Sequence, residues 1–135
     1  MQKIIIDTNI LIDYANGYAK WLDEFFKARN SDTKLVLPTI VIAEYFTSTA
    51  LERKQNAEVA DKTFSFFAKQ DLNEAIAKIL GTIMRRKTYP PGANTADLIV
   101  ASTAIFLDAE LATNDKEDFA KIPNLRLFDP KKLKN

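Results

Sequence analysis

The sequence predicts an α/β domain built on a mostly parallel sheet. Residues 3–6 and 35–37 are short apolar runs, which are typical of strands buried on both faces. Between and after these runs, apolar residues recur three and four positions apart, the spacing of amphipathic helices. Strand and helix signals that alternate in this way favour a parallel sheet crossed by helices. The 135 residues suit one compact unit, so we expect residues 1–135 to form a single domain.

The expected elements follow one another along the whole chain. Strands are expected at residues 3–6, 35–37, 110–113 and 125–128. Helices are expected at residues 10–16, 18–29, 40–51, 57–67, 76–84 and 95–107, with a helical turn at 118–121. Polar turns are expected at 30–34 and 114–116, a loop with two prolines and a glycine at 89–94, and a polar tail at 129–135. Residues 7–9, Thr39 and Asn94 or Thr95 are typical helix caps.

The chain contains no cysteine and no histidine. This composition excludes disulfides, thiol redox chemistry, Cys/His zinc sites, a Ser-His-Asp triad and a histidine general base. Any chemistry must therefore use carboxylates, hydroxyls, lysine, arginine or a metal ion bound by oxygen ligands.

The overall charge is +1, from 19 basic and 18 acidic residues, and gives no strong nucleic-acid signal. If a metal neutralised four acids, 19 minus 14 would leave +5, which permits binding of a polyanion without indicating it. The first residues enter a strand pattern without the order of a signal peptide, and no apolar run approaches the ~20 residues that span a bilayer. We therefore expect a cytoplasmic protein with no membrane partner.

Four acids stand where a parallel sheet places its ligand site. Asp7 follows the first expected strand, and Asp115 follows the strand that ends near residue 113. Because the carboxyl ends of parallel strands share one edge, these carboxylates are expected to be neighbours. Glu44 lies in an almost entirely apolar segment, and Asp97 lies in the first turn of a helix. We expect all four to converge at this edge.

Each of the four acids also has a purely structural explanation. Asp7 and Asp97 are typical of helix N-termini, and Asp115 is typical of a turn. Glu44 fits such explanations least, because a helix that is apolar all round is normally buried and a buried carboxylate requires a cation. That cation is either a lysine or arginine partner or a metal ion. Clustered carboxylates bind Mg²⁺, and a pair of such ions can promote phosphoryl displacement without a histidine base.

The chain resembles the PIN-domain nucleases, and among them the VapC-type toxins of toxin–antitoxin pairs. The resemblance is carried, in order, by Ile-Ile-Asp-Thr-Asn-Ile-Leu-Ile-Asp (5–13), Pro-Thr-Ile-Val-Ile-Ala-Glu-Tyr (38–45), Ala-Asp-Leu-Ile-Val-Ala (96–101) and Leu-Ala-Thr-Asn-Asp-Lys-Glu-Asp-Phe (111–119). It implies a three-layer α/β/α fold with four or five mostly parallel strands. It also implies an Mg²⁺- or Mn²⁺-dependent endoribonuclease.

The resemblance assigns roles to individual residues. It implies that the catalytic and metal-binding residues are Asp7, Glu44, Asp97 and Asp115. It implies supporting positions at Thr8, Asn9, Thr113 and Asp118, with Thr113 orienting a carboxylate or water. It further implies an RNA substrate, a homodimer and an antitoxin that covers the site. Residues 56–87 carry no motif of the family.

Other functions remain open from the sequence alone. One is a non-catalytic binding module that keeps the acids for structure, and another is an RNA-processing nuclease outside toxin–antitoxin systems. A phosphatase with an Asp nucleophile is less favoured, because such enzymes need a second Asp two positions on, where this chain has Asn9. Trp21 and Tyr18 are candidates for the core or for a partner surface. The candidate phosphate contacts, most of which we expect on solvated helix faces, are Arg53, Lys54, Arg85, Arg86, Lys87 and Lys116.

Overall fold

The fold is a five-stranded parallel sheet in the order β3-β2-β1-β4-β5. A computed structural model describes residues 1–28 and 32–134. The strands are β1 (Gln2–Ile6), β2 (Thr33–Pro38), β3 (Ala68–Gln70), β4 (Glu110–Ala112) and β5 (Arg126–Leu127). Every neighbouring pair is parallel, so the predicted parallel sheet is confirmed.

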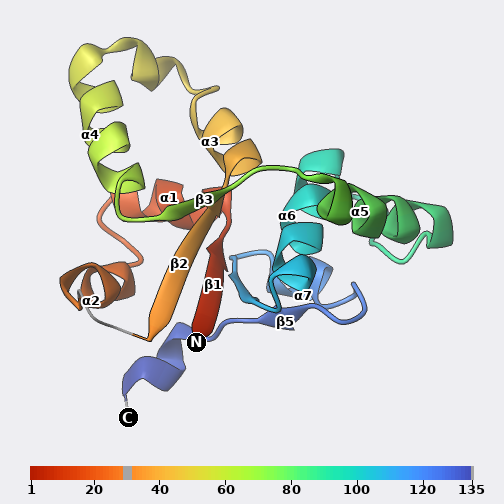
Figure 1. The fold of residues 1–135 in the computed structure, drawn as a ribbon. Helices are drawn as coiled ribbons and strands as arrows, with labels where there is room; N and C mark the ends of the chain where they lie inside the picture. Colours follow the sequence, from red (N-terminus) through yellow and green to blue (C-terminus); the bar gives the residue numbers. More distant parts are fainter. Residues whose placement is uncertain (29–31, 135) are drawn as a thin grey trace.

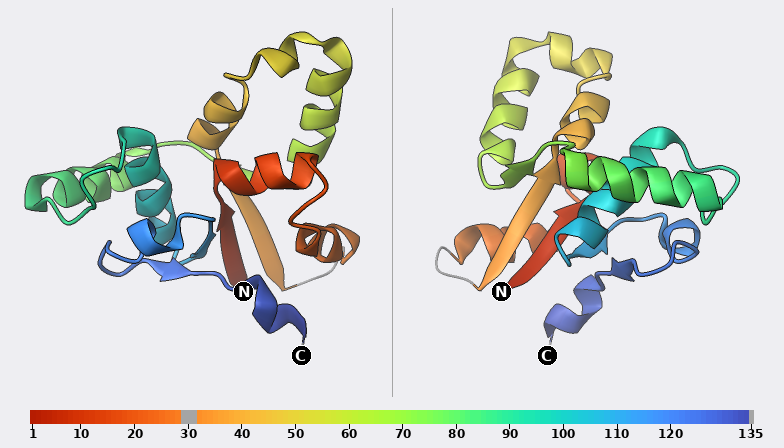
Figure 2. Two further views of the ribbon diagram at one scale, coloured as in Figure 1. Left: turned by 180° about the vertical axis from the view of Figure 1, so that it is seen from behind. Right: turned by 45° about the vertical axis from the view of Figure 1, so that its right-hand side comes forward.

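Helices cover both faces of this sheet. They are α1 (Thr8–Ala15), α2 (Trp21–Lys27), α3 (Thr39–Tyr45), α4 (Lys54–Phe64), α5 (Glu74–Arg86), α6 (Thr95–Phe106) and α7 (Lys116–Phe119), with 3-10 helices η1 (Thr49–Glu52) and η2 (Pro130–Lys134). Figures 1 and 2 show α1, α2 and α4 on one side of the sheet and α5, α6 and α7 on the other. This is the three-layer α/β/α arrangement that the resemblance implied.

The central strand β1 forms the middle of the core. Ile4, Ile5 and Ile6 are fully buried because β1 lies between β2 and β4 and is covered on both faces. Branched side chains favour such a pleated, enclosed position. The strand ends at Asp7, whose backbone N–H still donates to the Ala112 carbonyl of β4 at 3.1 Å. This hydrogen bond therefore holds the end of β1, where Asp7 lies, in register with the end of β4.

Several elements differ from the sequence-based expectation, most clearly α3 and β3, while the helix expected at 57–67 runs from Lys54 to Phe64 and the expected polar tail contains η2. The helix expected at 40–51 ends at Tyr45, because Thr47 and Ser48 bond locally: the Thr47 hydroxyl donates to the Glu44 carbonyl at 2.7 Å, and the Ser48 hydroxyl accepts from the Ala50 N–H at 3.2 Å. Pro38, not Thr39, is its N-cap residue. Strand β3 was not expected at all, since Ala-Lys-Gln has no apolar run and pairs with β2 alone.

Part of the second expected helix and of the following turn cannot be compared. Arg29 and residues 30–31 lie outside the described residues. The helix itself begins at Trp21 rather than Tyr18. No helix within residues 1–28 and 32–134 has the length and apolar character needed to cross a bilayer.

Candidate active site

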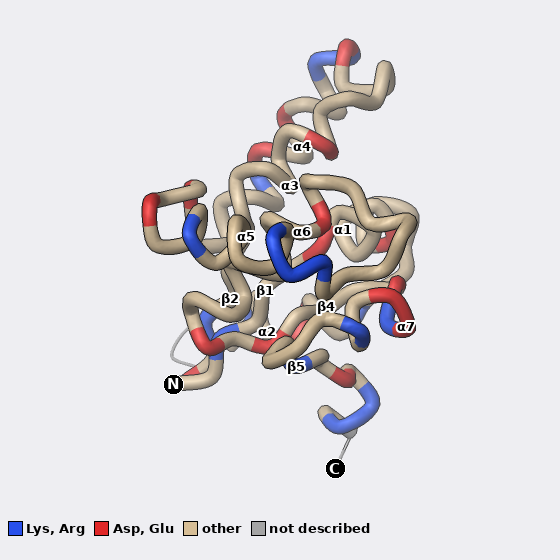
Figure 3. Tube along the Cα trace, turned by 90° about the vertical axis from the view of Figure 1, so that its right-hand side faces the viewer, with Lys and Arg blue, Asp and Glu red and all other residues tan. Residues whose placement is uncertain are grey.

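The four acids lie around the carboxyl edge of the three central strands. Asp7 directly follows β1, and Asp115 lies three residues beyond β4. Glu44 lies in α3, which follows β2, and Asp97 lies in the first turn of α6. Acidic positions on the trace gather where α1, α3 and α6 approach one another (Figure 3). The topology therefore brings residues from four separate segments to one edge of the sheet.

Asp7 is the buried member of this group, with 4% of its surface exposed. Its Oδ1 accepts from the Thr8 N–H at 2.9 Å, and its Oδ2 accepts from the Thr113 hydroxyl at 2.7 Å. Burial raises the pKa of Asp7 above its ordinary value, and the nearby charges of Asp97 and Glu44 add to the increase, while the two hydrogen bonds oppose it. Asp7 thus carries a cost of ionisation that a cation would relieve.

This cost predicts how Asp7→Asn affects stability. Because the folded state holds the Asp7 proton more tightly than the unfolded chain, the resulting stability is complete below pH 3.8 and is lost as pH rises through the raised folded pKa. Asparagine does not ionise, so in EDTA at pH 7 the variant should unfold at a higher temperature than the wild type. Calorimetry between pH 4 and pH 8 should show the difference shrinking towards pH 4; a variant that is less stable at pH 7 would contradict this.

Asn9 and Thr113 connect Asp7 to Asp115. The Asn9 Nδ2 lies 3.4 Å from Asp7 Oδ2, 3.4 Å from the Thr113 hydroxyl and 3.3 Å from Asp115 Oδ2. The Thr113 hydroxyl also accepts from the Asp115 N–H at 3.1 Å. Asp115 precedes α7 but makes no side-chain capping bond, so its exposed carboxylate faces Asn9 rather than serving its own helix.

Glu44 is held by Thr8, whose hydroxyl donates to Glu44 Oε1 at 2.8 Å. The expectation that Glu44 sits in a buried helix is wrong. In α3 only Val41 is buried, and Glu44 itself is half-buried. The apolar side chains around Glu44 instead form a partly exposed surface beside the site, which periodicity in the sequence did not distinguish from the core.

Asp97 has the structural role that its position in the helix suggested. Its N–H donates to Asn94 Oδ1 at 2.8 Å, and its Oδ2 accepts from the Asn94 N–H at 3.2 Å, which makes a capping box. The half-buried carboxylate also lines a small cavity of about 30 Å³ together with Asp115 and Asp118. Asp97 therefore caps α6 while it faces two further acids.

The donor chemistry of this group fits a hard divalent cation. The ion pairs found in the described part of the chain are Lys78–Glu74 and Arg126–Asp108, so none involves the four acids. Carboxylate and hydroxyl oxygens without a basic partner suit Mg²⁺ or Mn²⁺. Within the same residues, however, no three carboxylates stand close enough to form a ready-made metal cage. Several of their oxygens accept from protein donors, so a cation would have to draw them inward.

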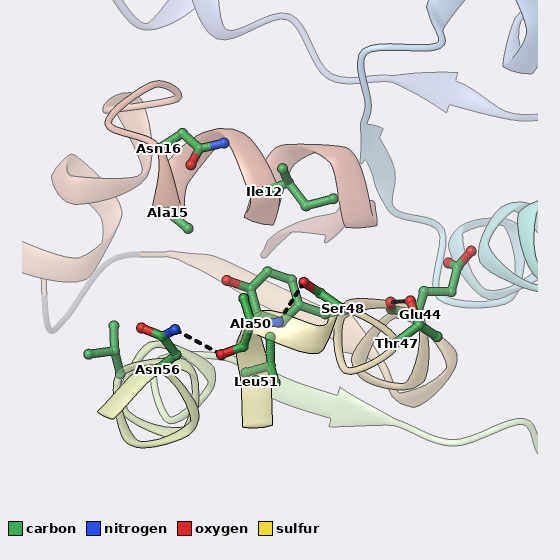
Figure 4. Close-up of a pocket in the computed structure, with 11 residues that line it drawn as sticks. Ile12, Ala15, Asn16, Glu44, Thr47, Ser48, Ala50, Leu51 and Asn56 are labelled. Atoms are coloured by element: carbon green, nitrogen blue, oxygen red, sulfur yellow. Dashed lines mark hydrogen bonds between the residues drawn. The ribbon is translucent and has the colours of Figure 1, made fainter. Parts of the chain in front are cut away.

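A groove beside Glu44 was not expected from the sequence. It has a volume of about 510 Å³ and runs between α1, η1 and α4; we call it the Ile12 groove. In Figure 4, Ile12 and Ala15 of α1 and the following Asn16 lie across from Leu51, with Glu44 at one end. Ile12 and Val59 are 47% and 64% exposed although both are large and apolar. Such a surface is typical of an interaction site.

The comparison with known families agrees with this architecture. The family model of the PIN domain matches residues 4–125. The chain belongs to the PIN-domain family. In this PIN domain, the matched region includes all of the sheet except the first two residues of β1 and the last two strand residues, and it includes every acidic residue discussed above.

Similar proteins carry VapC names. Ribonuclease VapC2 of Rickettsia felis is 29% identical over 131 residues, covering 91% of this chain and 94% of that protein. Ribonuclease VapC19 of Mycobacterium tuberculosis is 26% identical over 123 residues, covering 90% and 96%. The crystal structure of VapBC2 from Rickettsia felis, bound to a DNA fragment from their promoter, matches with a TM-score of 0.77 and 27% identity, covering 94% of this PIN domain and 98% of that chain.

Proposed function

We propose that this PIN domain is a metal-dependent endoribonuclease that hydrolyses RNA phosphodiester bonds. The observation that carries the proposal is Asp7: a buried carboxylate whose pKa is raised by burial and by the charges of Asp97 and Glu44, with no lysine or arginine paired to it in the described chain. Such an arrangement is costly unless a cation compensates it. Relatives named ribonucleases support RNA as the substrate.

The role proposed for each residue in hydrolysis follows from its position in the site. Asp7, Asp97 and Asp115 would hold one or two Mg²⁺ ions, directly or through water, and Mn²⁺ suits the same oxygens. When bound, Mg²⁺ supplies the Lewis acidity that lowers the pKa of water and offsets charge on the phosphate. Glu44, whose carboxylate accepts from the Thr8 hydroxyl, would bind the ion or orient the attacking water. Asn9 and Thr113 keep the carboxyl groups of Asp7 and Asp115 in place.

If water is the nucleophile, cleavage should not require the 2′-hydroxyl of the RNA. An RNA oligonucleotide with a single 2′-deoxy substitution at the cleaved nucleotide should be cut at a similar rate, because the 2′-hydroxyl takes no part. Mass spectrometry of the fragments should find no 2′,3′-cyclic phosphate in Mg²⁺. Protection by the 2′-deoxy substitution, or cyclic-phosphate ends, would contradict hydrolysis by water. Cutting that persists undiminished in EDTA would contradict the metal requirement.

Thr113 provides a test of the supporting residues. Thr113→Val keeps the shape of this buried side chain but removes its hydrogen bonds to Asp7 Oδ2 and from the Asp115 N–H. We expect kcat for RNA to fall ~10–100-fold, as for other groups that orient metal ligands. Stability should fall by about 1–3 kcal/mol in urea unfolding. Thr113→Ser retains the hydroxyl and should restore most of kcat; a serine variant as impaired as valine would argue against a hydrogen-bonding role.

We further infer that the protein is the toxin of a type II toxin–antitoxin pair and that its antitoxin binds in the Ile12 groove. Solved relatives are complexes of VapB with VapC. The groove supplies exposed apolar contacts from Ile12 and Val59 and ends at Glu44. An amphipathic segment with a basic residue near one end would fill it and meet the acids. The homodimer and the cytoplasmic location expected from the sequence remain predictions.

A further inference from the structure

A second cavity lies beside the acidic site, between α1, α2 and the segment that follows β5. Its volume is about 240 Å³, and we call it the Trp21 cavity. Trp21 and Phe128 contribute aromatic walls, and Asp13, Asn114 and Lys116 contribute polar groups. Pockets for drug-sized ligands usually measure ~300–1,000 Å³. The Trp21 cavity is therefore of a size that suits a smaller ligand, such as one planar ring system.

One loop joins the Trp21 cavity to the acidic site. The backbone N–H of Asn114 donates to Asn9 Oδ1 at 3.1 Å, on the side of the acids. The Asn114 side-chain Nδ2 donates to Asp13 Oδ2 at 2.8 Å, on the side of the cavity. Thr113, which binds Asp7, also lines the cavity. A group bound in the Trp21 cavity would therefore lie next to a phosphate held at the acids.

The aromatic walls offer a surface on which a ring can stack. The centroids of Trp21 and Phe128 are 5.1 Å apart at an interplanar angle of 42°. Phe128 is buried, whereas Trp21 remains half-buried even though it also contacts Phe25. Nucleobases stack on such side chains whatever their sequence, because every base has a π-face. Stacking supplies affinity here, and selectivity has to come from the polar groups.

Asp13 and Lys116 are the charged residues that line this cavity. In the described part of the chain neither residue forms an ion pair, and the hydrogen bond from Asn114 engages only Asp13 Oδ2. A carboxylate is complementary to two adjacent N–H donors, and an ammonium is complementary to a carbonyl oxygen. The Watson–Crick edge of guanine presents two adjacent N–H donors beside a carbonyl oxygen. Adenine presents a single amino donor beside a ring nitrogen acceptor, which faces a carboxylate unfavourably.

We propose that the Trp21 cavity binds a guanine base of single-stranded RNA next to the phosphate that is cut. The proposal rests on the proposed ribonuclease function and adds the base that it selects. Asp13 accepts from the base, Lys116 donates to its carbonyl oxygen, and Trp21 stacks against the ring. An arginine from a protein partner is less suitable, because Lys116 in the same cavity would repel a guanidinium.

Trp21 allows a direct test because it is the only tryptophan in the chain. Its fluorescence should fall saturably when guanosine 5′-monophosphate is added to the full-length protein in EDTA, where cleavage cannot occur. Adenosine 5′-monophosphate should bind at least about 10-fold more weakly. Equal affinity for the two nucleotides, or no fluorescence change with either, would overturn the proposal. Quenching by N-acetylargininamide as strong as that by the guanine nucleotide would also overturn it.

Matched variants test whether Asp13 is responsible for the preference for guanine. Asp13→Asn retains an acceptor oxygen for Asn114 but presents an amino group to the donors of guanine, so the preference for guanine over adenine should disappear. Asp61→Asn makes the same change on the exposed surface of α4, away from the cavity, and should leave the preference intact. An unchanged preference in Asp13→Asn would contradict the assignment of Asp13.

Cleavage mapping separates this proposal from the one on which it rests. With RNA of mixed sequence and Mg²⁺, wild-type cuts should fall beside guanine, and Asp13→Asn should cut with at least about 10-fold less bias. If RNA is not cut but the guanine nucleotide still binds selectively, the ribonuclease function fails and the cavity assignment stands. If RNA is cut without bias and neither nucleotide is preferred, the cavity assignment fails and the ribonuclease function stands.

Discussion

Asp7→Asn should reduce the rate of RNA cleavage by more than about 100-fold while the protein remains folded. Loss of groups that only orient metal ligands costs ~10–100-fold, and the most buried carboxylate of the site should cost more. Asparagine has the same shape and still accepts one hydrogen bond, from the Thr8 N–H or the Thr113 hydroxyl. Single-turnover cleavage of a labelled RNA in saturating Mg²⁺ measures the effect.

The control for this prediction is an acid of the same kind outside the site. Asp108→Asn removes a carboxylate whose Oδ1 lies 3.0 Å from Arg126 Nη2. Asp108 precedes β4, so it lies at the opposite end of that strand from Asp115. That variant should cleave RNA at close to the wild-type rate. If Asp7→Asn cleaves RNA within about threefold of the wild-type rate, the assignment of Asp7 is contradicted, because a folded protein without this charge would still hydrolyse RNA.

Ile12→Arg should weaken binding of the antitoxin by about 30-fold or more. The substitution removes apolar surface from the middle of the Ile12 groove and adds a charge that repels a basic antitoxin segment. Ile12 is 47% exposed in the free protein, so the fold should tolerate arginine there. Titration of the purified variant with the antitoxin proposed above measures the change in Kd.

Leu72→Arg is the matched control for the groove. Leu72 is 49% exposed, almost the same as Ile12, but it lies between β3 and α5 and does not line the groove. It should bind the antitoxin with wild-type affinity. Equal weakening by both substitutions would show that added surface charge, rather than the Ile12 groove, controls association.

Much of the fold could be predicted because the buried strands have a strong local signal. Ile4, Ile5 and Ile6 fill the centre of the sheet, and no helix pattern competes with that run. Strand β3 could not be predicted, because an edge strand of three residues with a lysine at its centre forms only through pairing with β2. The early end of α3 depends on local bonds by Thr47 and Ser48, which periodicity does not register.

The sequence was sufficient to predict that the four acids lie at one edge of the sheet, and less so to predict how they are arranged there. Residues at strand ends must share an edge, so Asp7 and Asp115 could be placed together from topology alone. The link between them through Asn9 depends on side-chain geometry that spacing does not reveal. Burial of Glu44 was wrongly expected, because an apolar helix at the surface next to a groove has the same pattern as one in the core. The Trp21 cavity could not be predicted either, because its lining residues come from separate segments of the chain.

The dependence of RNA cleavage on Mg²⁺ tests the central claim most directly. The claim is that the uncompensated carboxylates around Asp7 act by binding a divalent cation. The single-turnover rate, measured from zero to 20-fold excess over half-saturation, should rise from background in EDTA to a plateau, and Mn²⁺ should substitute. A rate that is fully maintained in EDTA, or RNA that stays intact at every Mg²⁺ and Mn²⁺ concentration, would contradict the claim.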